Sequence, residues 1–334
     1  MQQRKAGRVR LLAVAIGAAL ALGAGAGEAA NFSGTLYFTH FTGGQNVWKV
    51  PYAYNESTQA FTVGAQQNVA STNGADGIIF GANGNLLVGG QGSGNVYEVN
   101  PSTGAILNTQ QTGTASFHLT LAPDGNTVYT SNFGGRLNLV NVPIGSGSSF
   151  QNITGDDGGL TQVSFDDKGD VFYVNGQPNG GGNVGRIDLT TGVTNRLFSS
   201  VTPAHGIVFD PFTDLMTLFG AGHTGTFDET GANLMVSPNS TFGVGDFDQG
   251  AVDGFGHALV AGSDSLTFID YHTSHDITHP DFTTSVGGFG GIDDVAPLTG
   301  PGSNPNPNPT PEPATLLLLG AALAGMATAK RKRP

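Results

Sequence analysis

Six polar side chains stand at or next to the start of short apolar runs that recur along the chain: Asp76, His118, Thr161, His205, Asp248 and Asp293. Carboxyl, hydroxyl and imidazole groups of this kind bind a ligand or a cation, or transfer protons, when they converge on one point. In the alternative interpretation, each of them caps a strand end or hydrogen-bonds inside the protein without a ligand. Which interpretation holds depends on the elements that place these side chains.

The apolar runs belong to an internal repeat. An apolar run, a polar turn with Gly or Asp, and a second apolar run recur from residues 76, 117, 161, 205 and 248, with spacings of 41, 44, 44 and 43 residues. Each of these repeats is followed by another short run of alternating residues, which leads into a turn rich in Asn, Asp, Thr and Gly. Residues 95–99, for example, lead into residues 100–104. These units alternate as half-buried strands should, and we find no convincing helical periodicity outside the two ends of the chain.

Four short strands that repeat every 40 to 45 residues predict the blades of a β-propeller. Five full blades account for the five repeats. Residues 34–75 supply the outer strands of one more blade, and residues 289–295 supply its inner strand. We therefore predict an all-β, six-bladed β-propeller that is closed by pairing of its N- and C-terminal strands, with seven blades as the alternative.

At the level of the repeat, residues 205–211 (HGIVFDP) resemble the NHL-type, gluconolactonase-like and streptogramin-lyase-like propellers. This resemblance implies a central channel with the six polar positions at one mouth. Gluconolactonase-like enzymes hold a divalent cation there with a Glu, but Glu56, Glu98 and Glu229 all lie away from these positions. Streptogramin lyases use His and Glu near the axis, and a Glu partner for His118 or His205 is not evident.

Two other groups have the residue types of a metal site. His272, His275 and His279 lie close to Asp276, but the intervening residues indicate a loop or strand, so a solvated loop is favoured over a metal cluster. The pairs Asp156–Asp157 and Asp166–Asp167 could bind Ca²⁺ in an oxygen-rich turn, although acidic turns are common in this chain. We expect no obligatory cofactor, with Ca²⁺ as the possible exception.

The composition excludes several functions. The two ends carry eight of the 13 Lys and Arg and two of the 25 acidic residues, so the net charge of the body is 5 − 23 = −18. Binding of nucleic acid needs clustered Lys and Arg, and the body has none. The chain has no Cys, so disulfides and thiolate metal sites are impossible.

The N-terminus has the layout of a secretory signal. Four basic residues precede an apolar run over residues 11–27, and Ala29 follows as the last residue removed by signal peptidase. The alternative is a retained membrane anchor.

The C-terminus has three parts in order. Pro311, Glu312 and Pro313 precede an apolar run over residues 314–329, and a basic end follows, made of Lys330, Arg331, Lys332 and Arg333. The 16 apolar residues would form a transmembrane helix about 24 Å long, and the basic end should stay in the cytoplasm.

This tail resembles the PEP-CTERM sorting signal of Gram-negative bacteria, which is also described as an ice-binding-protein C-terminal domain although it carries no ice-binding chemistry. The resemblance implies processing by exosortase, a membrane protease-transpeptidase. The alternative is a plain anchor that is never processed. The resemblance covers only the last 25 or so residues and places the protein in the periplasm, at the outer surface or in the extracellular matrix, after transient anchoring in the inner membrane.

The chain thus divides into a signal peptide (1–29), a propeller (30–298), a Pro- and Asn-rich linker (299–311) and a sorting tail (312–334). We expect a non-catalytic binding or scaffold module whose partners are extracellular polysaccharide or surface proteins. The alternative is a metal-dependent hydrolase or lyase, lactonase-like or streptogramin-lyase-like, that acts at the channel mouth. Three or more convergent ligand groups would favour the enzyme, whereas an apolar or blocked channel would favour the binding module.

Overall fold

The computed structural model describes residues 31–41, 43–176, 182–199, 204–244 and 247–296. The predicted signal peptide with Ala29, the linker and the sorting tail with its helix lie outside these residues. The chain forms two compact units, and residues 33–53 and 61–308 form the larger one, which holds the blades. The smaller unit contains residues 1–32, 54–60 and 309–334. The described residues contain no helix that is long and apolar enough to cross a membrane.

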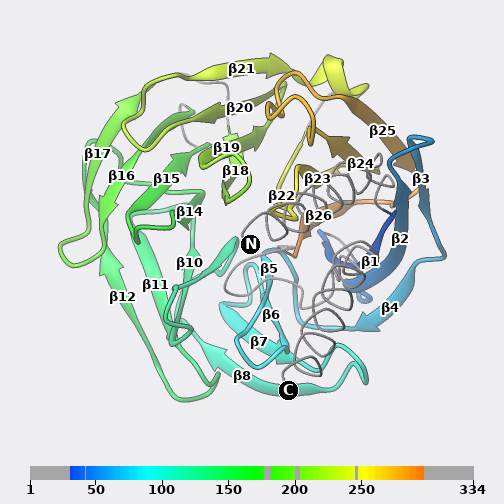
Figure 1. Ribbon diagram of the computed structural model, residues 1–334. Helices are drawn as coiled ribbons and strands as arrows, with labels where there is room; N and C mark the ends of the chain where they lie inside the picture. Colours follow the sequence, from blue (N-terminus) through cyan, green and yellow to red (C-terminus); the bar gives the residue numbers. More distant parts are fainter. Residues whose placement is uncertain (1–30, 42, 177–181, 200–203, 245–246, 297–334) are drawn as a thin grey trace, which may run out of the picture. The chain divides into compact units, whose positions relative to one another are not determined.

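The larger unit is a six-bladed β-propeller, as the repeat predicts, and the seven-bladed alternative is wrong. Figure 1 shows six sheets arranged around a common centre, and in each sheet the strands follow one another from the centre to the rim. The inner strands are β26 (Ile292–Val295), β5 (Ile78–Phe80), β9 (Leu119–Leu121), β14 (Gln162–Phe165), β18 (Ala204–Asp210) and β22 (Gly250–Val252). The five repeats at 76, 117, 161, 205 and 248 therefore correspond to inner strands.

Each inner strand pairs with an antiparallel second strand, and a third and an outer strand follow. The second strands are β1 (Asn31–His40), β6 (Leu86–Gly89), β10 (Thr127–Ser131), β15 (Val171–Asn175), β19 (Leu215–Gly220) and β23 (His257–Gly262). The third strands are β2 (Val47–Asn55), β7 (Asn95–Val99), β11 (Arg136–Asn141), β16 (Asn183–Asp188), β20 (His223–Phe227) and β24 (Ser265–Asp270).

The outer strands are β3 (Ala60–Val63), β8 (Ile106–Gln111), β12 (Ser148–Asn152), β17 (Val193–Phe198), β21 (Met235–Pro238) and β25 (Phe282–Gly287). Two short strands extend the blades: β4 (Gln67–Ala70) pairs with β2, and β13 (Thr154–Gly155) pairs in parallel with β17. One turn of 3₁₀-helix, η1 (Asn239–Phe242), follows β21.

The ring closes by the predicted pairing of the two ends of the body. Strand β26 is the inner strand of the blade whose other strands come from the N-terminus, and it pairs antiparallel with β1. Phe38 lies opposite Val295 and His40 lies opposite Ile292. This pairing removes the open sheet edges that an unclosed array of blades would expose.

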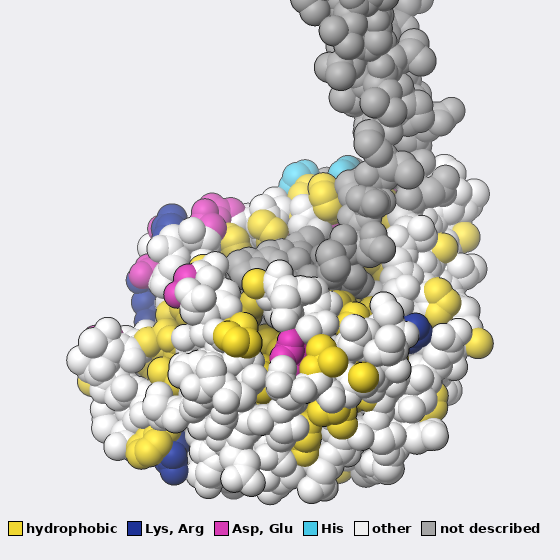
Figure 2. Space-filling view, turned by 90° about the horizontal axis from the view of Figure 1, so that it is seen from below, with side chains coloured by type: hydrophobic (Ala, Val, Ile, Leu, Met, Phe, Trp, Pro, Cys, Tyr) yellow, Lys and Arg dark blue, Asp and Glu magenta, His cyan; other side chains and the backbone are white. Residues whose placement is uncertain are grey.

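The core lies between neighbouring blades. Phe172, Ile207 and Phe227, for example, are buried in one apolar cluster that joins two blades. The inner strands β5, β22 and β26 are buried along their whole length, whereas the outer strand β8 is largely exposed. On the face shown in Figure 2, charged side chains are few and hydrophobic side chains are scattered among other side chains and backbone.

The turns between third and outer strands follow from local chemistry. The side-chain oxygen of Asn100 accepts hydrogen bonds from the backbone N–H groups of Ser102 and Thr103, and Gly104 then takes a left-handed conformation with φ of 72°. Short polar side chains favour such turns, and glycine adopts positive φ at little cost. The turn from Asp188 to Gly192 repeats the pattern.

Candidate functional site

All six predicted site residues lie where an inner strand begins. Asp76 and Asp248 each stand two residues before their strand, β5 and β22. His118 and Thr161 immediately precede β9 and β14, whereas His205 and Asp293 are the second residues of β18 and β26. Because the inner strands surround the centre of the propeller, this end of the channel gathers polar groups from six blades.

Two groups of ligand-bearing side chains converge there, and they share one residue. Asp76, His118 and Asp294 form the first group, and Asp248, Asp293 and Asp294 form the second. Within each group the ligand atoms all lie within 4.8 Å of one another. We call the five residues together the axial cluster.

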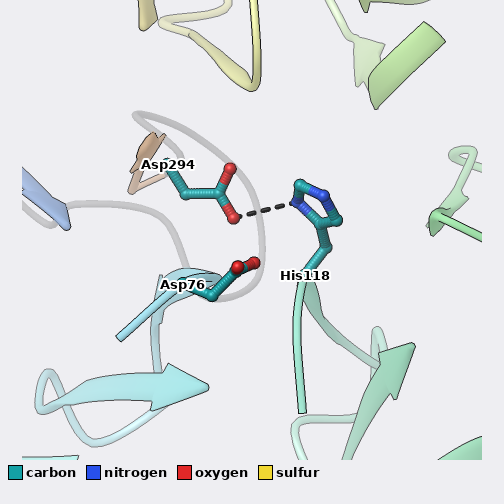
Figure 3. Close-up of side chains that lie close together, drawn as sticks. All are labelled: Asp76, His118 and Asp294. Carbon is teal, nitrogen blue, oxygen red and sulfur yellow. Dashed lines mark ion pairs between the residues drawn. The ribbon is translucent and has the colours of Figure 1, made fainter. Parts of the chain in front are cut away.

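An ion pair joins two members of the first group. Nδ1 of His118 lies 2.9 Å from Oδ2 of Asp294, and both side chains are almost fully buried. Figure 3 shows that Asp76, His118 and Asp294 point toward one another from three different blades. The site therefore exists only when the ring is closed, because β26 supplies Asp294.

Backbone and side-chain hydrogen bonds hold the first group in place. The backbone N–H of Gly77 donates to Oδ1 of Asp76 at 3.0 Å. The hydroxyl of Thr39 donates to the backbone oxygen of Asp76 at 2.6 Å and accepts from the backbone N–H of Asp294 at 3.1 Å. Thr39 thus joins the backbones of Asp76 and Asp294, which belong to neighbouring blades.

Glycine allows the close approach of two blades beside Asp76. A Cβ at Gly77 would lie 2.5 Å from the backbone nitrogen of Leu119 and 2.6 Å from the backbone oxygen of Phe117. Both distances are far below a normal van der Waals contact, so only glycine fits. The pattern of Asp followed by Gly at the strand start therefore has a steric reason, and it brings Asp76 near His118.

The second group reaches toward the surface. Nδ1 of His205 lies 3.1 Å from Oδ1 of Asp248, and these two side chains are 23% and 24% exposed. The carboxyl groups of Asp248 and Asp293 lie within 4.8 Å of each other. Asp248 and His205 therefore form the accessible edge of an otherwise buried cluster.

Burial of several carboxyl groups close to one another shifts their pKa values. Burial raises the pKa of Asp76 to about 7, the negative charges of Asp294 and Asp248 add to this shift, and His118 opposes it. Burial also raises the pKa values of Asp293 and Asp294. Without a cation, some of these carboxyl groups must therefore keep a proton near neutral pH.

His118 and His205 offset part of the electrostatic repulsion among these carboxyl groups. Burial alone would lower the pKa of His118, but Asp294, Asp76 and Asp248 raise it to about 10. Burial would raise the pKa of Asp248, but the hydrogen bond from His205 and the charge of His118 lower it. The imidazolium of His118 alone cannot balance the four carboxyl groups when all of them are ionised.

The donor set fits a hard divalent cation. Two oxygen ligands of Ca²⁺, each about 2.4 Å from the ion, stand at most about 4.8 Å apart. The second group offers three carboxylates at such spacings. In addition, Oδ2 of Asp293 and Oδ1 of Asp294 are buried and receive no hydrogen bond, whereas Oδ2 of Asp294 has His118 as its partner. Buried acceptors without partners are rare, and a cation would satisfy them.

The axial cluster differs from the predicted set in three residues, Asp294, Thr161 and His205. Asp294 is central to both groups, and the sequence analysis missed it, although the Asp293–Asp294 pair was the available signal. Thr161 belongs to neither group, because its hydroxyl accepts a hydrogen bond from the backbone N–H of Gly176 at 2.8 Å. The remaining five predicted residues lie in the cluster or, in the case of His205, on its edge.

The other metal candidates do not form a group of three close ligand atoms among the described residues. His272, His275 and His279 lie in an exposed turn after β24, as the solvated-loop interpretation predicts. The carboxylate of Asp157 accepts hydrogen bonds from Tyr173, Asn183 and Arg196, so it has no free position for a cation. Glu98 likewise accepts from three asparagine side chains, those of Asn83, Asn85 and Asn108.

Comparison with known proteins identifies the tail and the fold. Residues 309–333 match the PEP-CTERM protein-sorting motif, which marks an exported protein that is processed by exosortase and sorted to the cell surface. No curated protein sequence is similar enough to this chain to count as a relative.

Solved structures share the propeller fold at low sequence identity. A chain of a nidogen/laminin complex matches with a TM-score of 0.57 and 10% identity over 80% of this chain and 97% of that one. Virginiamycin B lyase from Staphylococcus aureus matches with a TM-score of 0.50 and 9% identity over 77% and 88%. Hydrazine synthase from Kuenenia stuttgartiensis has a TM-score of 0.50 and 14% identity over 68% and 74%. At such identities the likeness concerns the fold alone.

Proposed function

We propose that this protein is an exported, surface-sorted β-propeller that serves as a non-catalytic binding or scaffold module, with a divalent cation held in the axial cluster. Its partners would be extracellular polysaccharide or surface proteins in the matrix of a Gram-negative bacterium. The sorting motif at residues 309–333 supports the location. The fold does not decide between binding and catalysis, because propellers serve both.

The observation that carries the proposal is the burial of the chemically capable groups. Asp294 is fully buried, and Asp76 and His118 are 5% and 3% exposed. A substrate would have to contact such groups, whereas a small ion needs no open surface. A cation would remove the repulsion among the carboxylates and would join strands of several blades at the axis, which is the role of a structural ion.

Thermal melting of the full-length protein tests the cation. After treatment with EDTA, addition of Ca²⁺ to 100 times its Kd should stabilise the fold by about 2.7 kcal/mol. For a domain of this size that corresponds to a rise in Tm of about 5–10 °C. The Asp294→Asn variant should lose the response, and the exposed Asp167→Asn variant should keep it. An unchanged Tm of the wild type with Ca²⁺, Mg²⁺ and Mn²⁺ would refute the cation site.

Two further measurements test the scaffold role. Mass spectrometry of the protein from cells with and without exosortase should show loss of the tail near Glu312 only when the enzyme is present. The wild-type protein should co-sediment with the purified extracellular polymer of the same cells. If the protein binds neither the polymer nor surface proteins, the scaffold role is wrong.

A hydrolase or lyase is the second candidate, because one pair at the cluster is accessible. His205 and Asp248 are about a quarter exposed and only 3.1 Å apart, which is suitable for general acid–base chemistry. Turnover of lactones or of cyclic depsipeptides that is abolished in His205→Ala would favour this candidate. The absence of turnover in the cation-loaded protein would favour the scaffold.

A further inference from the structure

The channel has a second feature, which extends from beside the axial cluster to the opposite end of the inner strands. A cavity of about 500 Å³ lies among the inner strands β5, β9, β14 and β18 and extends to the turns that follow three of them. We call it the channel cavity. None of the five residues of the axial cluster is among its described lining residues.

The wall of the channel cavity is mainly apolar. Its aliphatic and aromatic lining includes Ile79, Leu119, Leu121, Phe165, Ile207 and Phe209. These residues come from four different inner strands, so the wall encloses its contents from several sides. A volume of this size is within the range of small-molecule sites, which combine an apolar wall with a few placed polar groups.

Two buried acceptors line this wall without partners. Gln249 and Asp166 are 4% and 7% exposed, and both line the cavity. No hydrogen bond reaches Oε1 of Gln249 or Oδ2 of Asp166. The other oxygen of Asp166 accepts from the backbone N–H groups of Lys168 and Asp170, so its carboxylate is held in position. Buried acceptors that stay unpaired cost free energy, which a donor on a ligand would recover.

The two acceptors belong to opposite ends of the inner strands. Gln249 directly precedes β22 and Asp166 directly follows β14, so one lies toward the axial cluster and the other toward the far mouth. The acidic body, with a net charge of −18, disfavours an anion. A fitting ligand therefore has an apolar body, a hydrogen-bond donor for Gln249 and a cationic donor for Asp166.

We propose that the channel cavity binds a small amphiphilic amine, that is, an apolar molecule with a protonated amino group and one further N–H or O–H donor. The ammonium group binds Asp166, the second donor binds Gln249, and the apolar body fills the space between them. This site is separate from the axial cluster and does not depend on a cation there.

Dansylcadaverine is a suitable probe, because it joins a fluorescent apolar ring to a sulfonamide N–H and a terminal ammonium group. On addition of the full-length protein, its emission should shift to the blue and increase. Dansylglycine carries the same fluorophore with a carboxylate in place of the amine, and it should bind at least tenfold more weakly. Equal binding of the two probes would overturn the proposal.

Three variants locate the bound probe. Gln249→Leu and Asp166→Asn each remove one acceptor with little change of shape, and each should weaken binding about tenfold. Ile207→Trp fills the cavity and should abolish binding. Asp214→Asn removes an exposed carboxylate that does not line the cavity and should leave binding within twofold.

Thermal melting shows whether each variant is folded. If Ile207→Trp does not fold, Gln249→Leu and Asp166→Asn decide whether the probe binds in the channel cavity. Unchanged affinity in both Gln249→Leu and Asp166→Asn would overturn the proposal. The measurement is made in EDTA and again in Ca²⁺, so its result is independent of the cation proposed for the axial cluster.

Discussion

The hydroxyl of Thr39 accepts a hydrogen bond from the backbone N–H of Asp294 at 3.1 Å, although 255 residues separate them in the chain. Thr39 belongs to the first described strand and Asp294 to the last. The same hydroxyl donates to the backbone oxygen of Asp76 in the next blade. One side chain thus joins the two ends of the propeller and positions two residues of the axial cluster.

Removal of the hydroxyl of Thr39 should weaken ring closure. In Thr39→Val the buried backbone groups of Asp76 and Asp294 lose their partner, which should cost about 1–3 kcal/mol. Thr39→Ser keeps the hydroxyl and should cost less than Thr39→Val. Denaturation with urea measures both. Equal losses in the two variants would show that packing of the methyl group, rather than the hydroxyl, matters.

A methyl group at Gly77 should disturb the contact between two blades. The added Cβ would lie within 2.7 Å of three backbone atoms of residues 117–119, so we expect Gly77→Ala to cost about 1–3 kcal/mol. Gly92→Ala, in the same blade, meets nothing within 4 Å and is the matched control. Urea denaturation of both variants checks the prediction. A Gly77→Ala variant as stable as Gly92→Ala would contradict the predicted clash.

Removal of one carboxylate from the axial cluster should have opposite effects with and without a cation. In EDTA, Asp293→Asn relieves repulsion among buried carboxyl groups and should raise stability by about 1 kcal/mol. In Ca²⁺ the same variant loses a ligand and should be less stable than the wild type. Melting curves in both solutions check the reversal. A variant that is less stable in both would show that Asp293 is needed for the fold itself.

Acid should remove the stabilising contribution of Asp157. Burial would raise its pKa, but hydrogen bonds from Arg196, Tyr173 and Asn183 lower it. Because the folded-state pKa lies below the unfolded value of about 3.9, the contribution is present above that pH and is lost as the pH falls through the folded value. Asp157→Asn should cost about 2–3 kcal/mol at pH 7, and its difference from the wild type should shrink in acid.

Urea denaturation between pH 7 and pH 2.5 measures this difference. Asp167→Asn removes an exposed carboxylate from a neighbouring turn and is the matched control. A difference between the wild type and Asp157→Asn that stays constant with pH would mean that Asp157 has the same pKa in both states.

Much of the fold follows from spacing in the sequence. Repeats that start at 76, 117, 161, 205 and 248 correspond to five inner strands, and residues 289–295 contain the sixth, β26. Short alternating runs and Gly-rich turns determine such strands locally, so they are visible without tertiary information. Closure could be predicted because the N-terminal strands had no inner strand of their own.

The details of the site depend on contacts that spacing does not encode. Asp293 and Asp294 are neighbours on one strand, where alternate side chains point to opposite faces, so only one was expected at the axis. Thr161 stands at an equivalent position of the repeat, but its hydroxyl bonds to the backbone of Gly176 instead. The channel cavity depends on side-chain volumes across five blades, and no local pattern reveals that Gln249 and Asp166 line one space.

Closure by β26 has a consequence for export. A polypeptide that crosses a membrane from its N-terminus delivers β1 first and residues 292–295 almost last. Until those residues arrive, β1 has an unpaired edge and Asp76 and His118 lack their partner Asp294. An unpaired edge can join other chains, so an exported chain that emerges in this order would be open to such pairing until β26 arrives.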